Sequence, residues 1–126
     1  MSTWTEMAKD NRLAANEARA AQRWRTCVSR AYYAVYSELT ELLISQNVMM
    51  PAGRANPRHE RLSNMVEANL KQFTHPVRVQ LAGAVRQLYK LRVMADYMPL
   101  IAVEHQEAKI ALGLLCQVYR CLEAKS

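Results

Sequence analysis

Glycine and proline are scarce in this sequence, with three glycines and four prolines among 126 residues. So little glycine excludes a collagen-like chain, and the isolated positions Gly53, Gly83 and Gly113 exclude the glycine-rich loops of P-loop and Rossmann sites. A hydrophobic content of 51% excludes an intrinsically disordered chain. The length suits one domain with one core, which we place at residues 1–126.

Long apolar runs and paired cysteines are also missing. No run of about 18 apolar residues occurs, and charges interrupt residues 1–12, so we expect neither a membrane span nor a secretory signal. Cys27, Cys116 and Cys121 form no C-x-x-C pair, which predicts small hydrophobic side chains with free thiols in a reducing cytoplasm. Three scattered histidines without an i,i+4 pair predict no metal site and no cofactor.

Positive charge is in excess, with 17 Lys and Arg against 11 Asp and Glu and a formal net charge of +6. The balance favours an anionic partner such as RNA or a nucleotide, and the alternative is an ordinary solvated face. Trp24, between Arg23 and Arg25, offers either a stacking surface for a base or a packing contact where the first two helices meet.

Between the few glycine- and proline-containing breaks, apolar residues recur at spacings of three and four, without strand-like alternation. This spacing predicts an all-α, antiparallel up-and-down bundle of about five helices. We expect the helices at about residues 3–20, 22–45, 58–73, 76–97 and 103–123. Tyr33, Tyr36, Ile110, Leu114 and Tyr119 lie off the main apolar stripes, which indicates either a dimer or partner surface, or a wide core stripe.

Two segments combine arginine with tyrosine. Residues 29–36 read SRAYYAVY, and residues 88–97 read LYKLRVMADY, in which Arg92 and Asp96 stand at i,i+4. Taken alone, the first segment is typical of an aromatic core patch and the second of a solvated ion pair.

Together with PRHERL at residues 57–62, these segments resemble the small stand-alone HEPN-domain proteins, in the order R-A-Y-Y-A, a His-containing helix start and R-x-x-A-D-Y. The resemblance covers residues 3–122. It implies an antiparallel helical bundle, usually dimeric and often encoded beside a minimal nucleotidyltransferase. It also implies a relation to toxin–antitoxin and defence systems, in which several branches of the family are metal-independent ribonucleases.

The nuclease branches carry R-x(4–6)-H near a helix end, with His for proton transfer and Arg for phosphate charge. Here the fifth residue after Arg92 is Tyr97 instead of His, and the carboxylate of Asp96 would repel a phosphate. Because this sequence differs from the nuclease motif at Tyr97, the resemblance does not by itself imply ribonuclease activity. Arg54 and His59 match the spacing literally, but about one such match is expected by chance in a sequence with this many arginines.

We therefore predict a HEPN-type nucleotide- or RNA-binding protein, one component of a two-gene toxin–antitoxin or nucleotidyltransferase-linked system. The alternatives are a metal-independent endoribonuclease with a diverged motif and a non-catalytic protein-interaction module. We expect a cytoplasmic homodimer that has a minimal nucleotidyltransferase and an RNA or nucleotide as partners, and no membrane. Six residues are predicted to line one ligand-binding cleft: Arg30, Tyr33, His59, Arg92, Asp96 and Tyr97.

Overall fold

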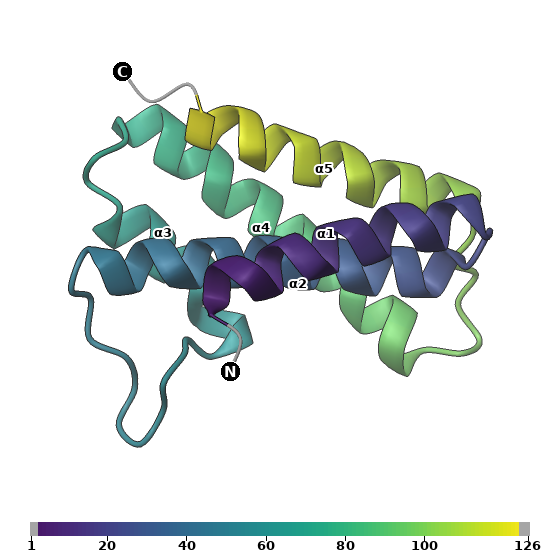
Figure 1. Cartoon of the computed structure of the whole chain (residues 1–126), viewed down its shortest axis with the longest axis horizontal. Helices are drawn as coiled ribbons and strands as arrows, with labels where there is room; N and C mark the ends of the chain where they lie inside the picture. Colours follow the sequence, from purple (N-terminus) through teal and green to yellow (C-terminus); the bar gives the residue numbers. More distant parts are fainter. Residues whose placement is uncertain (1–2, 124–126) are drawn as a thin grey trace.

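The computed structural model describes residues 3–123, and within them it contains five α-helices, a short 3-10 helix and no strand (Figure 1). The all-α prediction is confirmed. The elements are α1 (Trp4–Ala20), α2 (Trp24–Ser45), η1 (His59–Arg61), α3 (Leu62–Asn69), α4 (His75–Tyr97) and α5 (His105–Glu123). None of these helices is long and apolar enough to cross a membrane.

Helix α1 begins at a capping box. The Glu6 amide donates to Oγ1 of Thr3 at 3.0 Å, and the Thr3 amide donates to Oε1 of Glu6 at 2.8 Å, so two free amides of the first turn are satisfied. The connection to α2 is short, and Gln22 in it adopts a left-handed backbone with φ of 59°. That conformation is incompatible with a helix, which is why α2 begins at Trp24 and not at the predicted residue 22.

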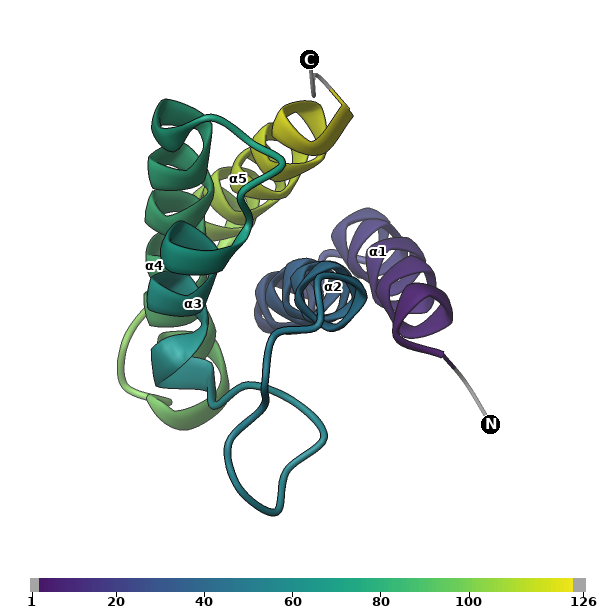
Figure 2. The same ribbon diagram turned by 90° about the vertical axis from the view of Figure 1, so that its left-hand side faces the viewer.

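Helix α2 is the centre of the bundle. It packs along α1 on one side and against α4 and α5 on the other, and Figure 2 shows it nearly end-on between them. Tyr32, Leu39 and Leu43 on α2 are fully buried. Tyr36 on α2 and Leu114 on α5 are buried as well, so the wide core stripe accounts for these two off-stripe residues.

Helix α3 is shorter than the predicted 58–73. The chain makes one 3-10 turn over His59–Arg61 before α3, and it leaves the helix at Leu70, whose ψ is 66°. Arg78 on α4 donates to the carbonyls of Glu67 at 2.9 Å and of Phe73 at 2.8 Å. The first bond satisfies a carbonyl in the last turn of α3, and the second holds the connection between α3 and α4, so a side chain from α4 compensates for the early end of α3.

Helices α4 and α5 complete the bundle. Thr74 precedes α4 and Pro76 occupies its second position, where the missing amide proton of proline costs no helical hydrogen bond. The helix ends at Tyr97, immediately before Met98 and Pro99, as the sequence predicts. Helix α5 begins at His105, two residues later than predicted.

Candidate functional site

A cleft of about 680 Å³ opens between α1, α2, α4 and the segment that leads into η1. The structure brings all six predicted site residues into its lining: Arg30, Tyr33, His59, Arg92, Asp96 and Tyr97. Their role in ligand binding stays a prediction. The lining also includes Trp4, Asn11, Ser29, Tyr36, Ser37 and Asn56, which the sequence did not single out as ligand-binding candidates.

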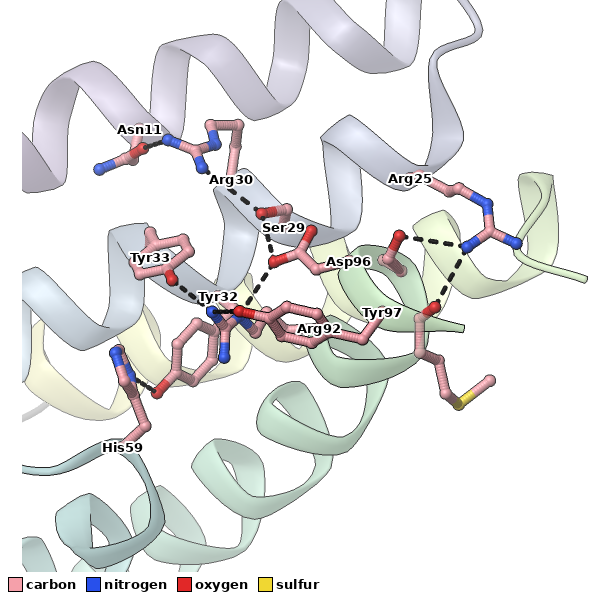
Figure 3. A network of polar contacts seen from close by, with 12 residues as sticks. Asn11, Arg25, Ser29, Arg30, Tyr32, Tyr33, His59, Arg92, Asp96 and Tyr97 are labelled. Atoms are coloured by element: carbon pink, nitrogen blue, oxygen red, sulfur yellow. Dashed lines mark hydrogen bonds and ion pairs between the residues drawn. The ribbon is translucent and has the colours of Figure 1, made fainter. Parts of the chain in front are cut away.

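Arg92 lies at the centre of the cleft and is only 8% exposed (Figure 3). Its Nε donates to Oδ2 of Asp96 at 3.0 Å, and its Nη2 donates to the hydroxyls of Tyr33 at 2.6 Å and Tyr97 at 3.2 Å. Burial works to lower the pKa of Arg92, but its interactions with the hydroxyls of Tyr33 and Tyr97 and with the carboxylate of Asp96 outweigh burial and raise that pKa. The guanidinium is therefore a permanent, fixed positive charge.

A second arginine joins the same network from α2. Arg30 donates from Nη1 to Oδ1 of Asn11 at 2.9 Å and from Nη2 to Oγ of Ser29 at 3.4 Å. The Ser29 hydroxyl donates in turn to Oδ2 of Asp96 at 3.3 Å. Asp96 therefore links the hydrogen bonds of Arg30 to those of Arg92, as the dashed lines in Figure 3 show.

Tyr33 is shared by the two arginines. The guanidinium carbon of Arg30 lies 5.0 Å from the centroid of its ring, and that of Arg92 lies 5.2 Å away. Both distances are within the range of a cation–π attraction, which offsets part of the repulsion between two like charges. The tyrosine ring thus allows two guanidinium groups to occupy one cleft.

His59 is surrounded by tyrosine rings. Its Nδ1 lies 2.7 Å from the hydroxyl of Tyr32, and its ring centroid lies 4.5 Å from that of Tyr36. Burial, and after it the positive charge of Arg92, lowers the pKa of His59 below its ordinary value. The imidazole is therefore neutral at physiological pH and is able to accept a proton.

Two buried tyrosines hold the segment before η1 against α2. The Tyr36 hydroxyl donates to the carbonyl of Pro57 at 2.6 Å and accepts from Nδ2 of Asn56 at 2.5 Å. Burial raises the pKa of both Tyr36 and Tyr32, so both hydroxyls stay protonated and remain able to donate. These bonds place His59 in the cleft, although it lies outside the five α-helices.

Arg25 supports the cleft from outside its lining by binding the end of α4, a role that no sequence pattern predicted. Its guanidinium donates to the carbonyl oxygens of Met94 at 3.1 Å, Ala95 at 3.1 Å, Met98 at 3.2 Å, Pro99 at 3.4 Å and Ile101. The Ala95 carbonyl has no amide donor four residues later, because residue 99 is proline, and a cation is favourable at that end of the helix dipole. Arg25 therefore holds the turn of α4 that carries Asp96 and Tyr97.

Metal-ligating groups do not gather anywhere in residues 3–123: no group of three or more His, Cys, Asp or Glu side chains is placed to hold an ion. The three cysteines form no disulfide. Cys27 is buried, as predicted for a small hydrophobic side chain, but Cys116 is exposed, on a face of α5 that no other described helix covers.

The fold and the cleft together define a class: a small helical bundle with two linked arginines, several tyrosine hydroxyls and a neutral histidine in one cavity. A sequence model of the HEPN domain matches residues 1–125, so the chain belongs to the HEPN-domain family. No curated protein and no solved structure matches this chain. Membership supports a helical module that works with nucleotides or RNA, in a family whose domains commonly dimerise.

Proposed function

We propose that this protein binds the phosphate of a nucleotide or of RNA in the cleft. It would act in the cytoplasm as one component of a two-gene toxin–antitoxin or nucleotidyltransferase-linked system. The observation that carries the proposal is the pair Arg30 and Arg92, which share one hydrogen-bonded network and line one cavity. Arginine's planar fork suits phosphate oxygens, and a fixed guanidinium loses little entropy on binding them.

One nitrogen of the Arg92 guanidinium can donate to a ligand. Its Nε and Nη2 donate to protein groups, whereas Nη1 makes no hydrogen bond within residues 3–123. The half-buried Trp4 ring, which also lines the cleft, packs edge to face on the buried Tyr36 with centroids 6.1 Å apart, and its remaining surface offers an apolar contact to a base. Phosphate and base thus both have a complementary surface in the same cavity.

Asp96 sets a condition on the ligand. Its carboxylate is 28% exposed in the cleft, where it repels a phosphate but accepts a hydrogen bond from an amino or hydroxyl group. A ligand that has a phosphate for the arginines and a hydroxyl or amino group for Asp96 therefore fits this cleft better than free phosphate does. A nucleotide with its ribose hydroxyls is such a ligand.

Tryptophan emission tests the proposal, because Trp4 lines the cleft and the only other tryptophan is Trp24. In Trp24→Phe protein, adenosine 5′-monophosphate (AMP) or a short single-stranded RNA should change Trp4 emission saturably. Arg30→Gln should weaken binding about tenfold, the usual effect of losing a charge-assisted hydrogen bond. Arg86→Gln is the matched control, since it removes one exposed charge from α4 outside the cleft. Equal effects of the two changes would contradict the proposal.

Ribonuclease activity is a second candidate, which the neutral His59 favours because it lines the same cleft as Arg92. The purified protein should then cleave total RNA in the presence of EDTA. His59→Asn and Arg92→Lys should each abolish the cleavage while the protein stays folded. No cleavage by the wild-type protein at high concentration would reject this candidate.

The homodimer and the nucleotidyltransferase partner belong to the same proposal. The turn after α4 exposes apolar side chains beside the cleft, including Leu100 at 99% and Tyr97 at 65% exposure. Such a surface is typical of an interaction site. Sedimentation equilibrium should show a dimer that Leu100→Asp weakens. If the protein instead stays monomeric and forms a stable complex with a co-expressed nucleotidyltransferase, the non-catalytic interaction module is favoured.

A further inference from the structure

A second cavity, of about 480 Å³, lies between α1 and α5; we call it the α1–α5 groove. Both helices pack against α2, and Figure 2 shows α5 above α2 and α1 to its right. The groove is lined by one face of α1, by the start of α2 and by one face of α5. It shares no lining residue with the cleft.

Positive charge converges on the α1–α5 groove. Arg12 and Arg19 line it from α1 and Lys109 lines it from α5, and no Asp or Glu is among its lining residues. Within residues 3–123 the only ion pair joins Arg92 to Asp96, so none of these three cations has a carboxylate partner. Because like charges across a groove repel, an anion bound between them would remove an unfavourable interaction.

Apart from Asn16, the rest of the lining is made of small or apolar residues and two rings, those of Trp24 and His105. Trp24 and His105 meet edge to face at the start of α5, with ring centroids 5.3 Å apart. Leu112 lines the groove farther along α5, and Gly113 has no side chain to fill it: a Cβ added there would meet no atom within 4 Å. A flat ring therefore finds apolar contacts within reach of the cations.

We propose that the α1–α5 groove is a second binding site, for a phosphate ester that carries a flat heteroaromatic ring. The phosphate would lie among Arg12, Arg19 and Lys109, and the ring would lie toward Trp24. The volume of about 480 Å³ is in the range of small-ligand sites. A free nucleoside monophosphate and the terminal nucleotide of an RNA strand share this chemistry. The site is independent of the function proposed for the cleft.

The two tryptophans separate the two sites. In Trp4→Phe protein, Trp24 is the only tryptophan and reports the groove, just as Trp4 reports the cleft in Trp24→Phe protein. AMP should change Trp24 emission saturably. If AMP causes no saturable change in Trp24 emission, the groove proposal is overturned, whatever the result for Trp4. If Trp24 emission changes and Trp4 emission does not, the result counts against binding in the cleft only.

Gly113→Glu provides the decisive variant. It places a carboxylate among the cations of the groove, so AMP should bind about tenfold more weakly. The protein should still fold, because replacing a glycine inside a helix removes an unfavourable residue. Gly83→Glu is the matched control, a helical glycine on α4 that does not line the groove and where an added Cβ also meets nothing. Equal affinity in both variants would overturn the proposal.

Three further probes identify the chemistry, again in Trp4→Phe protein. Adenosine lacks the phosphate and inorganic phosphate lacks the ring, so both should bind more weakly than AMP. If either binds as well as AMP, the proposed pairing of ring and phosphate is wrong. If a short single-stranded RNA binds more tightly than AMP, the ligand of the groove is the end of an RNA strand. If the RNA binds more weakly than AMP, the ligand is a free nucleotide.

A thiol measurement checks the fluorescence result independently. Cys116 is exposed and lines the groove, whereas Cys27 is fully buried. In a Cys121→Ser background, AMP should slow the reaction of Cys116 with a thiol reagent, and the slowing should be lost in Gly113→Glu protein. A reaction rate that AMP leaves unchanged would contradict binding in the groove.

Discussion

The cleft and the α1–α5 groove lie on two sides of α1 and hold positive charge in opposite ways. In the cleft, Arg92 and Arg30 are tied to protein partners, including the carboxylate of Asp96. In the groove, Arg12, Arg19 and Lys109 have no carboxylate partner among residues 3–123. The first arrangement is preorganised but partly neutralised by Asp96. In the second no carboxylate of the described residues opposes the cations, and only Arg12 is positioned by an aromatic ring, with its guanidinium carbon 4.2 Å from the centroid of Tyr119.

This difference has two consequences for recognition. Hydrogen-bonded arginines select ligands whose acceptor atoms match the fixed positions of the N–H groups, because the arginines are already oriented before the ligand binds. The cations of the groove are exposed side chains without a carboxylate partner in the part of the chain that the structure describes, so they attract any anion, and salt screens them more strongly than it screens the buried Arg92. Changes in the cleft should therefore affect stability and binding together, whereas changes in the groove should affect binding alone.

Removing Arg92 should have the largest effect. Arg92→Ala removes the donor of two tyrosine hydroxyls and the cationic partner of Asp96, which keeps only the 3.3 Å hydrogen bond from Ser29, so the free energy of unfolding should fall by about 2–4 kcal/mol. Urea denaturation measures the change. Arg86→Ala, an exposed arginine of the same helix, should change stability by less than about 0.5 kcal/mol. A similarly small loss for Arg92→Ala would show that the cleft network is not preorganised.

Removing Arg25 should have the next largest effect. Arg25→Ala frees the carbonyls at the end of α4 and should lower the free energy of unfolding by about 1–2 kcal/mol. Denaturation at equilibrium compares it with Arg23→Ala, an exposed arginine two residues earlier that makes no side-chain cap. If both variants lose the same small amount, the bonds from Arg25 do not hold the cleft.

Asp96→Asn removes the negative charge of this side chain but keeps its size and shape. It removes the negative charge that opposes a phosphate in the cleft, so AMP should bind there several-fold to about tenfold more tightly. Emission from Trp4 should report the gain, and emission from Trp24 should report no change in the groove. Asp10→Asn on α1, an exposed carboxylate outside both cavities, serves as the control. A gain at both tryptophans would mean that the two sites respond only to net charge.

The smallest effect is a pH dependence that belongs to the cleft. Because the pKa of His59 is lowered in the folded state, the unfolded chain binds the proton more readily. Stability should therefore fall as the pH drops below the ordinary histidine value of about 6.5. His59→Asn should flatten this decline in urea denaturation, and replacing the exposed His105 of the groove should not. An identical decline in His59→Asn protein would contradict the assignment.

Much of the fold could be predicted from the sequence, because helical periodicity is a local signal. The spacing of apolar residues located all five α-helices to within a few residues. Where the limits differ, the cause is a local conformation that periodicity does not register, such as the left-handed Gln22 or the 3-10 turn at His59.

The candidate site was harder to predict. The tyrosine and arginine segments marked six side chains that the fold brings into one cleft, although nothing tests their ligand. Arg25 and Asn56 escaped notice because their bonds join a side chain to groups far away in the sequence, to Met94 and Tyr36. Such contacts leave no periodic pattern. The α1–α5 groove escaped for the same reason, since its cations come from helices at opposite ends of the chain.

The guanidinium of Arg25 also affects how the chain fluctuates. Its five acceptors span Met94 to Ile101, so one side chain from α2 ties this whole stretch together, in addition to the backbone bonds from the Met98 amide to Met94 and from the Ile101 amide to Met98. A segment held in this way opens as one unit. Amide hydrogen exchange after Met94 should then follow a single shared opening event, and that event would release Asp96 and Tyr97 from the cleft at the same moment.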